Sequence, residues 1–276
     1  MDFSFRRTYR GPLKAIVLDW AGTTIDYGSC APAIVFAQVF ARRGVTISMD
    51  AARAPMGTDK KTHLEKIVQE PNVREQWQKI FGRAPNADDV EAMYQEFVPL
   101  QLSVLAEYAD LIPGTLDAVK AFRARGLKIG TTTGYAREIV QVVQVEAAKR
   151  GYTPDAIVCA TDVPQGRPAP FMCWQNMIQL GVYPPEAVVK VDDTLTGIEE
   201  GLNAGMWTIG LAKTGNEIGL NATEIAQLPP DELNARLQRA YARMAQCGAH
   251  FVVDGIWDVP MVLDEIDARL RRGEKP

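Results

Sequence analysis

The sequence predicts an α/β fold, with a doubly wound parallel sheet and an inserted helical cap domain. Short apolar segments rich in β-branched residues recur along the chain, and segments of helical length separate them. The first such segment, residues 14–18 (KAIVL), is instead followed by residues 29–110, which show no strand pattern. We therefore expect an α/β core domain formed by residues 1–28 and 111–276, and a helical cap domain formed by residues 29–110.

Each expected element is bounded by residues that begin or end helices and strands. Pro32, for example, opens the first cap helix and Gly44 closes it. The expected helices are 32–43, 58–69, 71–81 and 86–108 in the cap, and 115–125, 136–150, 171–180, 195–204, 231–246 and a last helix in the core. The expected strands are 14–18, 128–132, 156–160, 187–191, 206–211 and 250–253.

Composition makes several classes of partner and site unexpected. The net charge of -4 gives no reason to expect nucleic acid or an anionic membrane as partner. The four cysteines form no CxxC pair and there are two histidines, so we expect neither a disulfide framework nor a structural zinc site. No apolar run approaches the ~20 residues of a membrane span, and the start MDFSFRRTYR differs from a signal peptide. We expect a cytoplasmic protein.

Chemically active side chains follow four of the expected strands. They are Asp19, then Thr133 with Gly134, then Arg167 in the loop PQGRPAP, then Asp192 with Asp193. The carboxyl ends of parallel strands meet at the edge where open α/β sheets bind ligands. Carboxylates, a hydroxyl and a cation there suit a phosphoryl group bound with a divalent metal, and hard oxygen ligands indicate Mg²⁺. The structural alternatives are that Asp19 caps a turn and that Asp192 or Asp193 caps the helix from Leu195.

The motifs DWAGTT, TTGY, GRP and DDT, at these separations, resemble the haloacid dehalogenase superfamily of phosphotransferases over nearly the whole chain. DWAGTTIDYG, PMG followed by Lys60, IGTTTGY and NAGMWT most closely resemble its phosphonatase family. This resemblance implies a Rossmann-like core of the haloacid dehalogenase type. It also implies hydrolysis of the carbon–phosphorus bond of phosphonoacetaldehyde to acetaldehyde and phosphate, in 2-aminoethylphosphonate degradation. The family resemblance further implies a Mg²⁺-dependent homodimer.

The resemblance assigns roles to the motif residues. Asp19 would be the nucleophile that becomes an aspartyl phosphate, and Lys60 would form a Schiff base with the substrate aldehyde. The metal ligands would be Asp19, the backbone carbonyl of Ala21 and Asp193, while Thr133, Gly134 and Arg167 would bind the phosphoryl group. Most superfamily members carry a second Asp at the position of Ala21 and many an acid at that of Gly197. This chain therefore departs from the pattern of ordinary phosphomonoesterases.

Carbon–phosphorus cleavage explains why Ala21 and Lys60 belong together. The leaving group is a carbanion, so an acid that protonates a departing oxygen has no use, whereas a protonated imine accepts the electrons. Lys60 shares a partly apolar helix face with His63, in the first helical turn. Burial and the helix dipole there would both lower the pKa of Lys60. The alternative is that Lys60 extends to solvent, as we expect of Lys61.

Three further residues and two other functions remain open at this point. His63 is either a proton shuttle for imine chemistry or a structural histidine, while Met56 and Trp20 either line the aldehyde pocket or serve in packing. A phosphomonoesterase or sugar-phosphate mutase would act on p-nitrophenyl phosphate independently of Lys60. A catalytically silent phosphate-binding or regulatory protein, which only Ala21 favours, would bind metal and phosphate without turnover.

Overall fold

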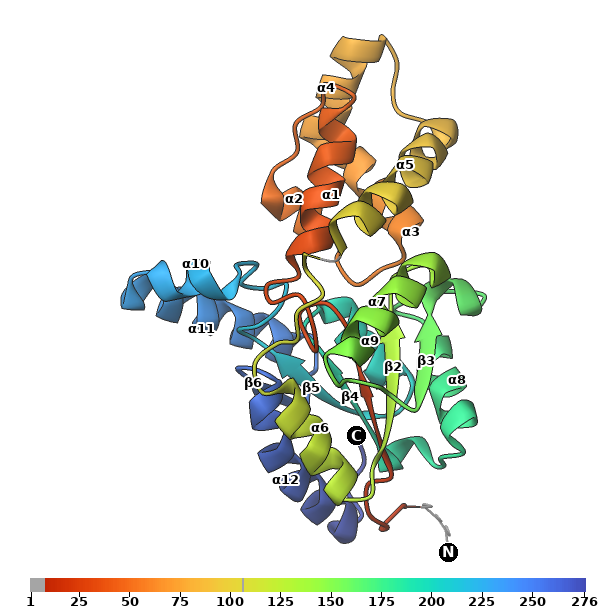
Figure 1. Cartoon of the computed structure of the whole chain (residues 1–276), viewed down its shortest axis with the longest axis vertical. Coiled ribbons are helices and arrows are strands. Elements are labelled where there is room, and N and C mark those ends of the chain that lie inside the picture. The colour runs from red at the N-terminus through yellow and green to blue at the C-terminus, as the bar shows by residue number, and fades with distance from the viewer. Residues whose placement is uncertain (1–7, 106) are drawn as a thin grey trace, which may run out of the picture.

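The computed structural model describes residues 8–105 and 107–276, and its centre is a six-stranded sheet (Figure 1). The strand order is β3-β2-β1-β4-β5-β6, and all neighbouring strands run parallel. The strands are β1 (Ala15–Leu18), β2 (Lys128–Thr133), β3 (Ala156–Cys159), β4 (Val188–Asp192), β5 (Trp207–Leu211) and β6 (Phe251–Val253). The predicted doubly wound α/β fold is confirmed.

Helices cover both faces of this sheet. Side chains of β1 alternate between the faces, so Ile16 and Leu18 join one buried cluster while Ala15 and Val17 join another. The first cluster includes side chains of α6 (Thr115–Ala124), α7 (Arg137–Lys149) and α12 (Val259–Arg272). The second includes side chains of α8 (Phe171–Leu180), and α9 (Leu195–Asn203) packs on β4 and β5. Burial on both faces explains why β1 is a continuous apolar run.

Among the described residues, six helices lie between β1 and β2, and the first five make up residues 30–105, which we call the helical insert. They are α1 (Cys30–Ala41), α2 (Met49–Arg53), α3 (Lys60–Gln69), α4 (Pro71–Phe81) and α5 (Ala87–Leu105). The insert has apolar packing of its own, for example between Phe36 and Phe97, whose ring centroids are 4.5 Å apart. In Figure 1 the insert stands beyond the carboxyl ends of the strands. It therefore faces the edge where the sequence places the candidate site.

The structure corrects some of the expected element boundaries. Helix α1 begins at Cys30 rather than Pro32, because the Asp26 carboxylate accepts hydrogen bonds from the backbone N–H groups of Cys30 and Ala31, each at 3.0 Å. Helices α2 and α10 (Ala222–Gln227) were not predicted, since each spans too few residues for a clear periodic pattern. Three expectations extend beyond the described residues: the core domain with its polar start includes residues 1–7, and both the helix 86–108 and the cap domain 29–110 include residue 106.

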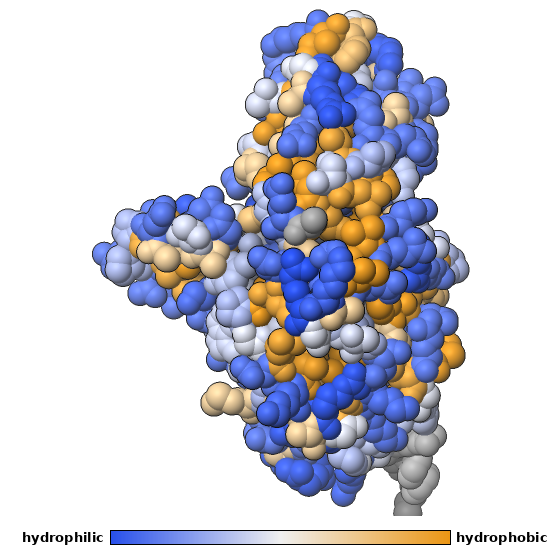
Figure 2. Space-filling view, in the orientation of Figure 1, coloured by the Kyte–Doolittle hydropathy of each residue, from blue (hydrophilic) through white to orange (hydrophobic). Residues whose placement is uncertain are grey.

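Helices α10 and α11 (Pro230–Gln246) connect β5 to β6 and project from the core (Figure 1). Hydrophilic residues cover much of this projection, while hydrophobic surface gathers near the middle of the molecule, where insert and core meet (Figure 2). Among the residues that the structure describes, no helix is long and apolar enough to cross a membrane.

Candidate functional site

The carboxyl ends of the central strands and the helical insert enclose a cavity of about 20 Å³. The predicted residues that line it are Asp19, Ala21, Met56, Lys60, Thr133, Gly134 and Arg167. Ser29, Pro32, Gly57, Tyr135 and Thr194 also line it and were not predicted. Of these five, Gly57, Tyr135 and Thr194 had a usable signal, because they end the motifs PMG, TTGY and DDT. The volume suffices for about one water molecule.

Sheet topology brings the core residues of this site together. Strand β1 lies between β2 and β4, with Leu18 paired to Thr131 on one side and to Val191 on the other. Residues that end or follow these strands therefore meet at one edge, although they are far apart in sequence. Gly134 admits the insert there, because a Cβ on it would lie 2.4 Å from the carbonyl oxygen of Thr58.

Three buried carboxylates, those of Asp19, Asp192 and Asp193, form a group that could hold a metal ion, with one oxygen of each within 4.8 Å of the others. Burial, followed by the charges of Asp19 and Asp192, raises the pKa of Asp193 well above its usual value. Asp193 accepts hydrogen bonds from Thr23 Oγ1 at 3.0 Å and from the backbone N–H of Asn216 at 2.9 Å. Since no ion pair to Asp193 is found among the described residues, a divalent cation fits this donor set.

Asp192 is held differently from its neighbour. Its Oδ1 accepts hydrogen bonds from the backbone N–H of Thr194 at 3.0 Å and from the Thr194 hydroxyl at 2.7 Å. Thr194 in turn caps α9 by accepting from the N–H of Gly197 at 3.1 Å. The suggestion that one of the two aspartates caps this helix was therefore wrong, because Thr194 does so. Although burial disfavours its charge, Arg167 and Lys190 lower the pKa of Asp192.

Arg167 lies at the centre of a buried ionic network beneath the cavity. Its Nη2 is 2.7 Å from Asp19 Oδ1 and 3.2 Å from Asp192 Oδ2, and its Nε is 2.9 Å from Glu200 Oε2. Lys190 Nζ lies 2.7 Å from Asp192 Oδ2 and donates to Thr132 Oγ1 at 2.7 Å. Lys190 and Glu200 were not predicted as site residues from the sequence. A lysine inside the apolar run AVVKVD was the available signal, since such strands are buried on both faces.

Lys60 projects from the first turn of α3 into the cavity and is 5 % exposed. Burial lowers its pKa to about 8, with Asp19 opposing this shift and Arg167 adding to it. Its Nζ lies 5.1 Å from the ring centroid of Tyr135 and 5.6 Å from that of Phe36. The solvent-extended alternative for Lys60 does not apply to this structure.

Lys61 behaves as expected of the neighbouring helix position. It is exposed and its Nζ pairs with Glu91 at 2.7 Å. Asp59, rather than Thr58, caps α3 by accepting from the backbone N–H of Thr62 at 3.0 Å. The two adjacent lysines therefore have opposite environments, set by their positions around one helix.

His63 and Trp20 are buried but are not among the residues that line the cavity. His63 stacks on Phe36 with centroids 3.7 Å apart, and its Nε2 lies 2.9 Å from the carbonyl oxygen of Ala52. Burial, reinforced by the charge of Lys60, lowers the pKa of His63 well below its usual value. Trp20 packs on Tyr152 with centroids 5.5 Å apart. A proton-transfer role for His63 stays a prediction.

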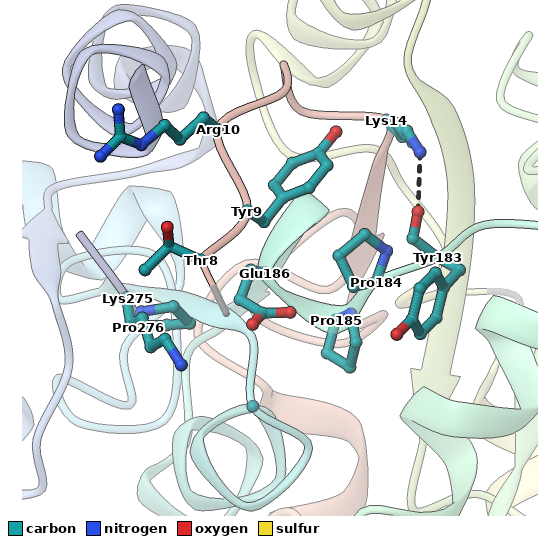
Figure 3. Close-up of a pocket in the computed structure, with 11 residues that line it drawn as sticks. Thr8, Tyr9, Arg10, Lys14, Tyr183, Pro184, Pro185, Glu186, Lys275 and Pro276 are labelled. Carbon is teal, nitrogen blue, oxygen red and sulfur yellow. Dashed lines mark hydrogen bonds between the residues drawn. The ribbon is translucent and has the colours of Figure 1, made fainter. Parts of the chain in front are cut away.

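A larger cavity of about 750 Å³ lies near the chain termini, by the amino ends of β1 and β4. Figure 3 shows that Tyr9, Lys14, Glu186 and Lys275 surround it, with Lys14 Nζ donating to the carbonyl oxygen of Tyr183 at 2.7 Å. None of the predicted site residues lines this cavity. Size alone therefore does not identify the functional site.

Comparison with known proteins places this chain in a family. Residues 13–205 match the haloacid dehalogenase-like hydrolase family. The chain is 50 % identical to a phosphonoacetaldehyde hydrolase of Syntrophobacter fumaroxidans, with 99 % of each chain covered. It is 45 % identical to one of Nitratidesulfovibrio vulgaris, with 98 % of this chain and 96 % of the relative covered.

A solved structure gives the same result for the fold. The crystal structure of a phosphonoacetaldehyde hydrolase-like protein from Oleispira antarctica superposes with a TM-score of 0.97 at 39 % identity, with 100 % of both chains covered. The resemblance inferred from the sequence motifs is confirmed. By sequence and by structure, the chain belongs to the phosphonoacetaldehyde hydrolase family of the haloacid dehalogenase-like hydrolases.

Proposed function

We propose that this chain hydrolyses the carbon–phosphorus bond of phosphonoacetaldehyde, yielding acetaldehyde and phosphate. The observation that carries the proposal is that the buried Lys60, with its pKa lowered to about 8, lines the same small cavity as Asp19. Ala21 lines it as well and contributes no acid. A lysine amine available near neutral pH beside a carboxylate nucleophile suits the two bonds that this reaction must make.

The reaction begins at Lys60. Its neutral amine attacks the aldehyde carbon, and uptake of one proton with loss of water gives a protonated imine. An oxygen of Asp19 then attacks phosphorus while the carbon–phosphorus bond breaks, and the bonding electrons move into the imine to form an enamine. Protonation at carbon and hydrolysis release acetaldehyde and regenerate Lys60. Water then hydrolyses the aspartyl phosphate to phosphate and regenerates Asp19.

The surrounding residues have matching roles in this proposal. Arg167, the Thr133 hydroxyl and the backbone of Gly134 bind the phosphoryl oxygens, and Met56 contacts the short aldehyde. Asp19, the Ala21 carbonyl and Asp193 would hold Mg²⁺, which would neutralise charge on the phosphonate and the transferring phosphoryl group. The burial of Asp193 beside two further carboxylates supports this assignment. His63 is proposed to assist proton transfer, through its placement one helical turn from Lys60.

The decisive test offers the protein phosphonoacetaldehyde with Mg²⁺ and measures acetaldehyde and phosphate separately. We expect the two products in equal amounts, and loss of both on exhaustive chelation of the metal. A parallel assay with an alkyl phosphate monoester should give little turnover, because no second acid stands at Ala21 to protonate a departing alkoxide. Rapid hydrolysis of that ester without carbon–phosphorus cleavage would replace this proposal with a phosphomonoesterase.

We also propose that residues 29–110 form a cap domain that moves relative to the core formed by residues 1–28 and 111–276. The cavity of about 20 Å³ is too small for a substrate with several non-hydrogen atoms. Its walls come from both parts of the chain, with Met56, Gly57 and Lys60 supplied by the insert. Separation of these walls would admit the substrate, and their return would exclude water from the imine.

A homodimer is our proposal for the assembly. Apolar side chains on one side of α8 and in the turn after it are exposed, with Trp174 at 42 %, Ile178 at 72 % and Tyr183 at 62 %. An adjacent hollow of about 380 Å³ is lined by Trp174, Met177, Ile178, Gly181, Val182 and Tyr183. A second copy would cover this surface. Sedimentation should show a dimer for the protein and a monomer for Ile178→Glu, and an unchanged dimer would move the interface elsewhere.

A further inference from the structure

Arg53, at the end of α2, ties the helical insert to two segments of the core. Its Nη1 donates a hydrogen bond to the carbonyl oxygen of Gly28 at 2.8 Å, in the segment that leads from β1 into the insert. Its Nη2 donates to the carbonyl oxygen of Gly219 at 2.9 Å, in the loop 213–219 that follows β5. Arg53 is partly buried, so water competes less for these hydrogen bonds than it would at an exposed site.

Asn216 continues this connection from the insert to the carboxylate group. Its side chain makes two long contacts with Arg53, accepting from Nη1 at 3.4 Å and donating to the backbone carbonyl at 3.3 Å. Its own backbone N–H donates to Asp193 Oδ2 at 2.9 Å. One residue therefore contacts an arginine of the insert through its side chain and the buried Asp193 through its main chain.

We propose that Arg53 and Asn216 are positioning residues that couple the placement of the helical insert to the metal affinity of Asp193. The backbone N–H of Asn216 fixes one oxygen of Asp193, and the loop 213–219 that carries this N–H is held against the insert by Arg53. When the insert withdraws, the contacts of Arg53 with Asn216 and Gly219 are lost. The loop then holds Asp193 less firmly, and the metal ion binds more weakly.

Coupling of this kind acts in both directions. If closure of the insert strengthens metal binding, metal binding must favour closure by the same factor. Closure is required for chemistry because Met56 and Lys60 come from the insert, whereas Asp19 and Asp193 come from the core. The link through Arg53 thus favours a closed insert when the metal is in place. This inference rests on the proposed metal site and on insert movement, but not on the identity of the substrate.

Asn216→Ala tests the side-chain contacts with Arg53 without removing the backbone hydrogen bond to Asp193. The variant keeps the backbone N–H that Asp193 accepts and removes only the side-chain contacts to Arg53. Arg53→Met removes the guanidinium contacts with a side chain of similar length. The matched control is Arg236→Met, because Arg236 lines the same cavity of about 470 Å³ as Arg53 but pairs with Glu232 on its own helix at 2.7 Å.

The experiment titrates each protein with Mg²⁺ by calorimetry, without substrate. We expect the dissociation constant to rise by about fivefold or more in Asn216→Ala and Arg53→Met, and to stay within about twofold of the parent in Arg236→Met. Hydrogen exchange supplies a second readout. Mg²⁺ should slow amide exchange in residues 27–30 of the parent protein and slow it less in Asn216→Ala, which keeps the contact from Arg53 to Gly219.

The outcomes distinguish this inference from the function proposed above. Equal Mg²⁺ affinity in the parent and both link variants, or equal protection of residues 27–30 in parent and Asn216→Ala, would overturn the coupling and leave the catalytic proposal standing. Failure of the parent to bind Mg²⁺ at all would overturn both the metal site and the coupling. Should Arg53→Met fold poorly, Asn216→Ala carries the comparison, since it removes no buried charge.

Discussion

The Asp192 carboxylate occupies the space that a side chain at position 197 would need. A Cβ placed on Gly197 would lie 2.0 Å from Asp192 Cγ and 2.1 Å from its Oδ2. The family resemblance implied that Gly197 stands where many members of the wider superfamily carry an acid. Asp192, at the end of β4, therefore leaves no room for a side chain at position 197 in α9.

Gly197→Ala should therefore displace the Asp192 carboxylate from Thr194, Lys190 and Arg167. We expect a loss of roughly 1–3 kcal/mol in the free energy of unfolding, because an added methyl group overpacks a buried site. Chemical denaturation of the variant measures this loss. In an Asp192→Ala background the same substitution should cost much less, and an equal cost in both backgrounds would show that the strain arises elsewhere.

Lys60→Arg should abolish carbon–phosphorus cleavage while leaving the fold intact. Arginine keeps the positive charge, but its guanidinium stays protonated near neutral pH and cannot form the imine. We expect turnover to fall by several powers of ten, each of about 1.4 kcal/mol in the barrier. Product assays measure the loss, and Lys61→Arg, at the exposed neighbouring position, is the control with near-normal turnover.

Borohydride gives an independent reading of the same lysine. Added during turnover, it should reduce the imine to a stable secondary amine on the peptide that contains Lys60, and it should inactivate the protein only when aldehyde is present. Mass spectrometry locates the adduct. Adducts confined to other lysines, or near-normal turnover of Lys60→Arg, would exclude the Schiff-base mechanism.

The pKa of Lys60, lowered to about 8, predicts how activity depends on pH. The neutral amine is the reactive form, so kcat/KM should rise about tenfold per pH unit below about pH 8 and level off above it. This rise with pH should be absent from the rates of the steps that follow imine formation. Rapid-quench measurement of the enamine stage can isolate those steps. A profile flat from about pH 6 upward would show that Lys60 is not the titrating nucleophile.

The same pKa predicts an effect on stability with a defined sign. Folding lowers the pKa of Lys60 below its unfolded value, so its contribution to stability is present above the unfolded pKa and is lost as pH falls through about 8. Lys60→Met should therefore stabilise the protein more near pH 7 than near pH 10. Urea unfolding at the two pH values measures the difference, and a gain that does not depend on pH would contradict the burial argument.

Glu200→Gln should weaken the hold on Arg167. Glu200 Oε2 lies 2.9 Å from Arg167 Nε and accepts from Thr132 Oγ1 at 3.0 Å, in a site that is fully buried. Without the Glu200 charge, Asp19 and Asp192 are the carboxylates left in this network to pair with Arg167 and Lys190. We expect the free energy of unfolding to fall by about 3 kcal/mol. Glu199→Gln, next in sequence and exposed, is the control and should change stability by less than about 0.5 kcal/mol.

The sequence by itself determined the six strands, the longer helices and the chemically active residues that follow the strands. Local patterns are sufficient for this, because a strand buried on both faces must be apolar and the residue after it must begin a loop. Asp19, Thr133 and Asp193 could therefore be assigned to one edge of the sheet from the order of strands and helices alone. Helical spacing likewise distinguished Lys60 from Lys61, since one turn of a helix assigns adjacent residues to different faces.

Only the tertiary structure decided which charged side chains of these elements pair and which side chains fill the space between them. Lys190, Glu200 and Arg167 meet because β4, α9 and the loop after β3 converge, and no local pattern records such a convergence. The exclusion of a side chain at Gly197 by Asp192 depends on the distance between a strand end and a helix turn. The link from Arg53 through Asn216 to Asp193 joins residues that are too far apart in sequence for helix or strand periodicity to relate them. Contacts of this kind depend on packing in three dimensions, which is set by the whole chain.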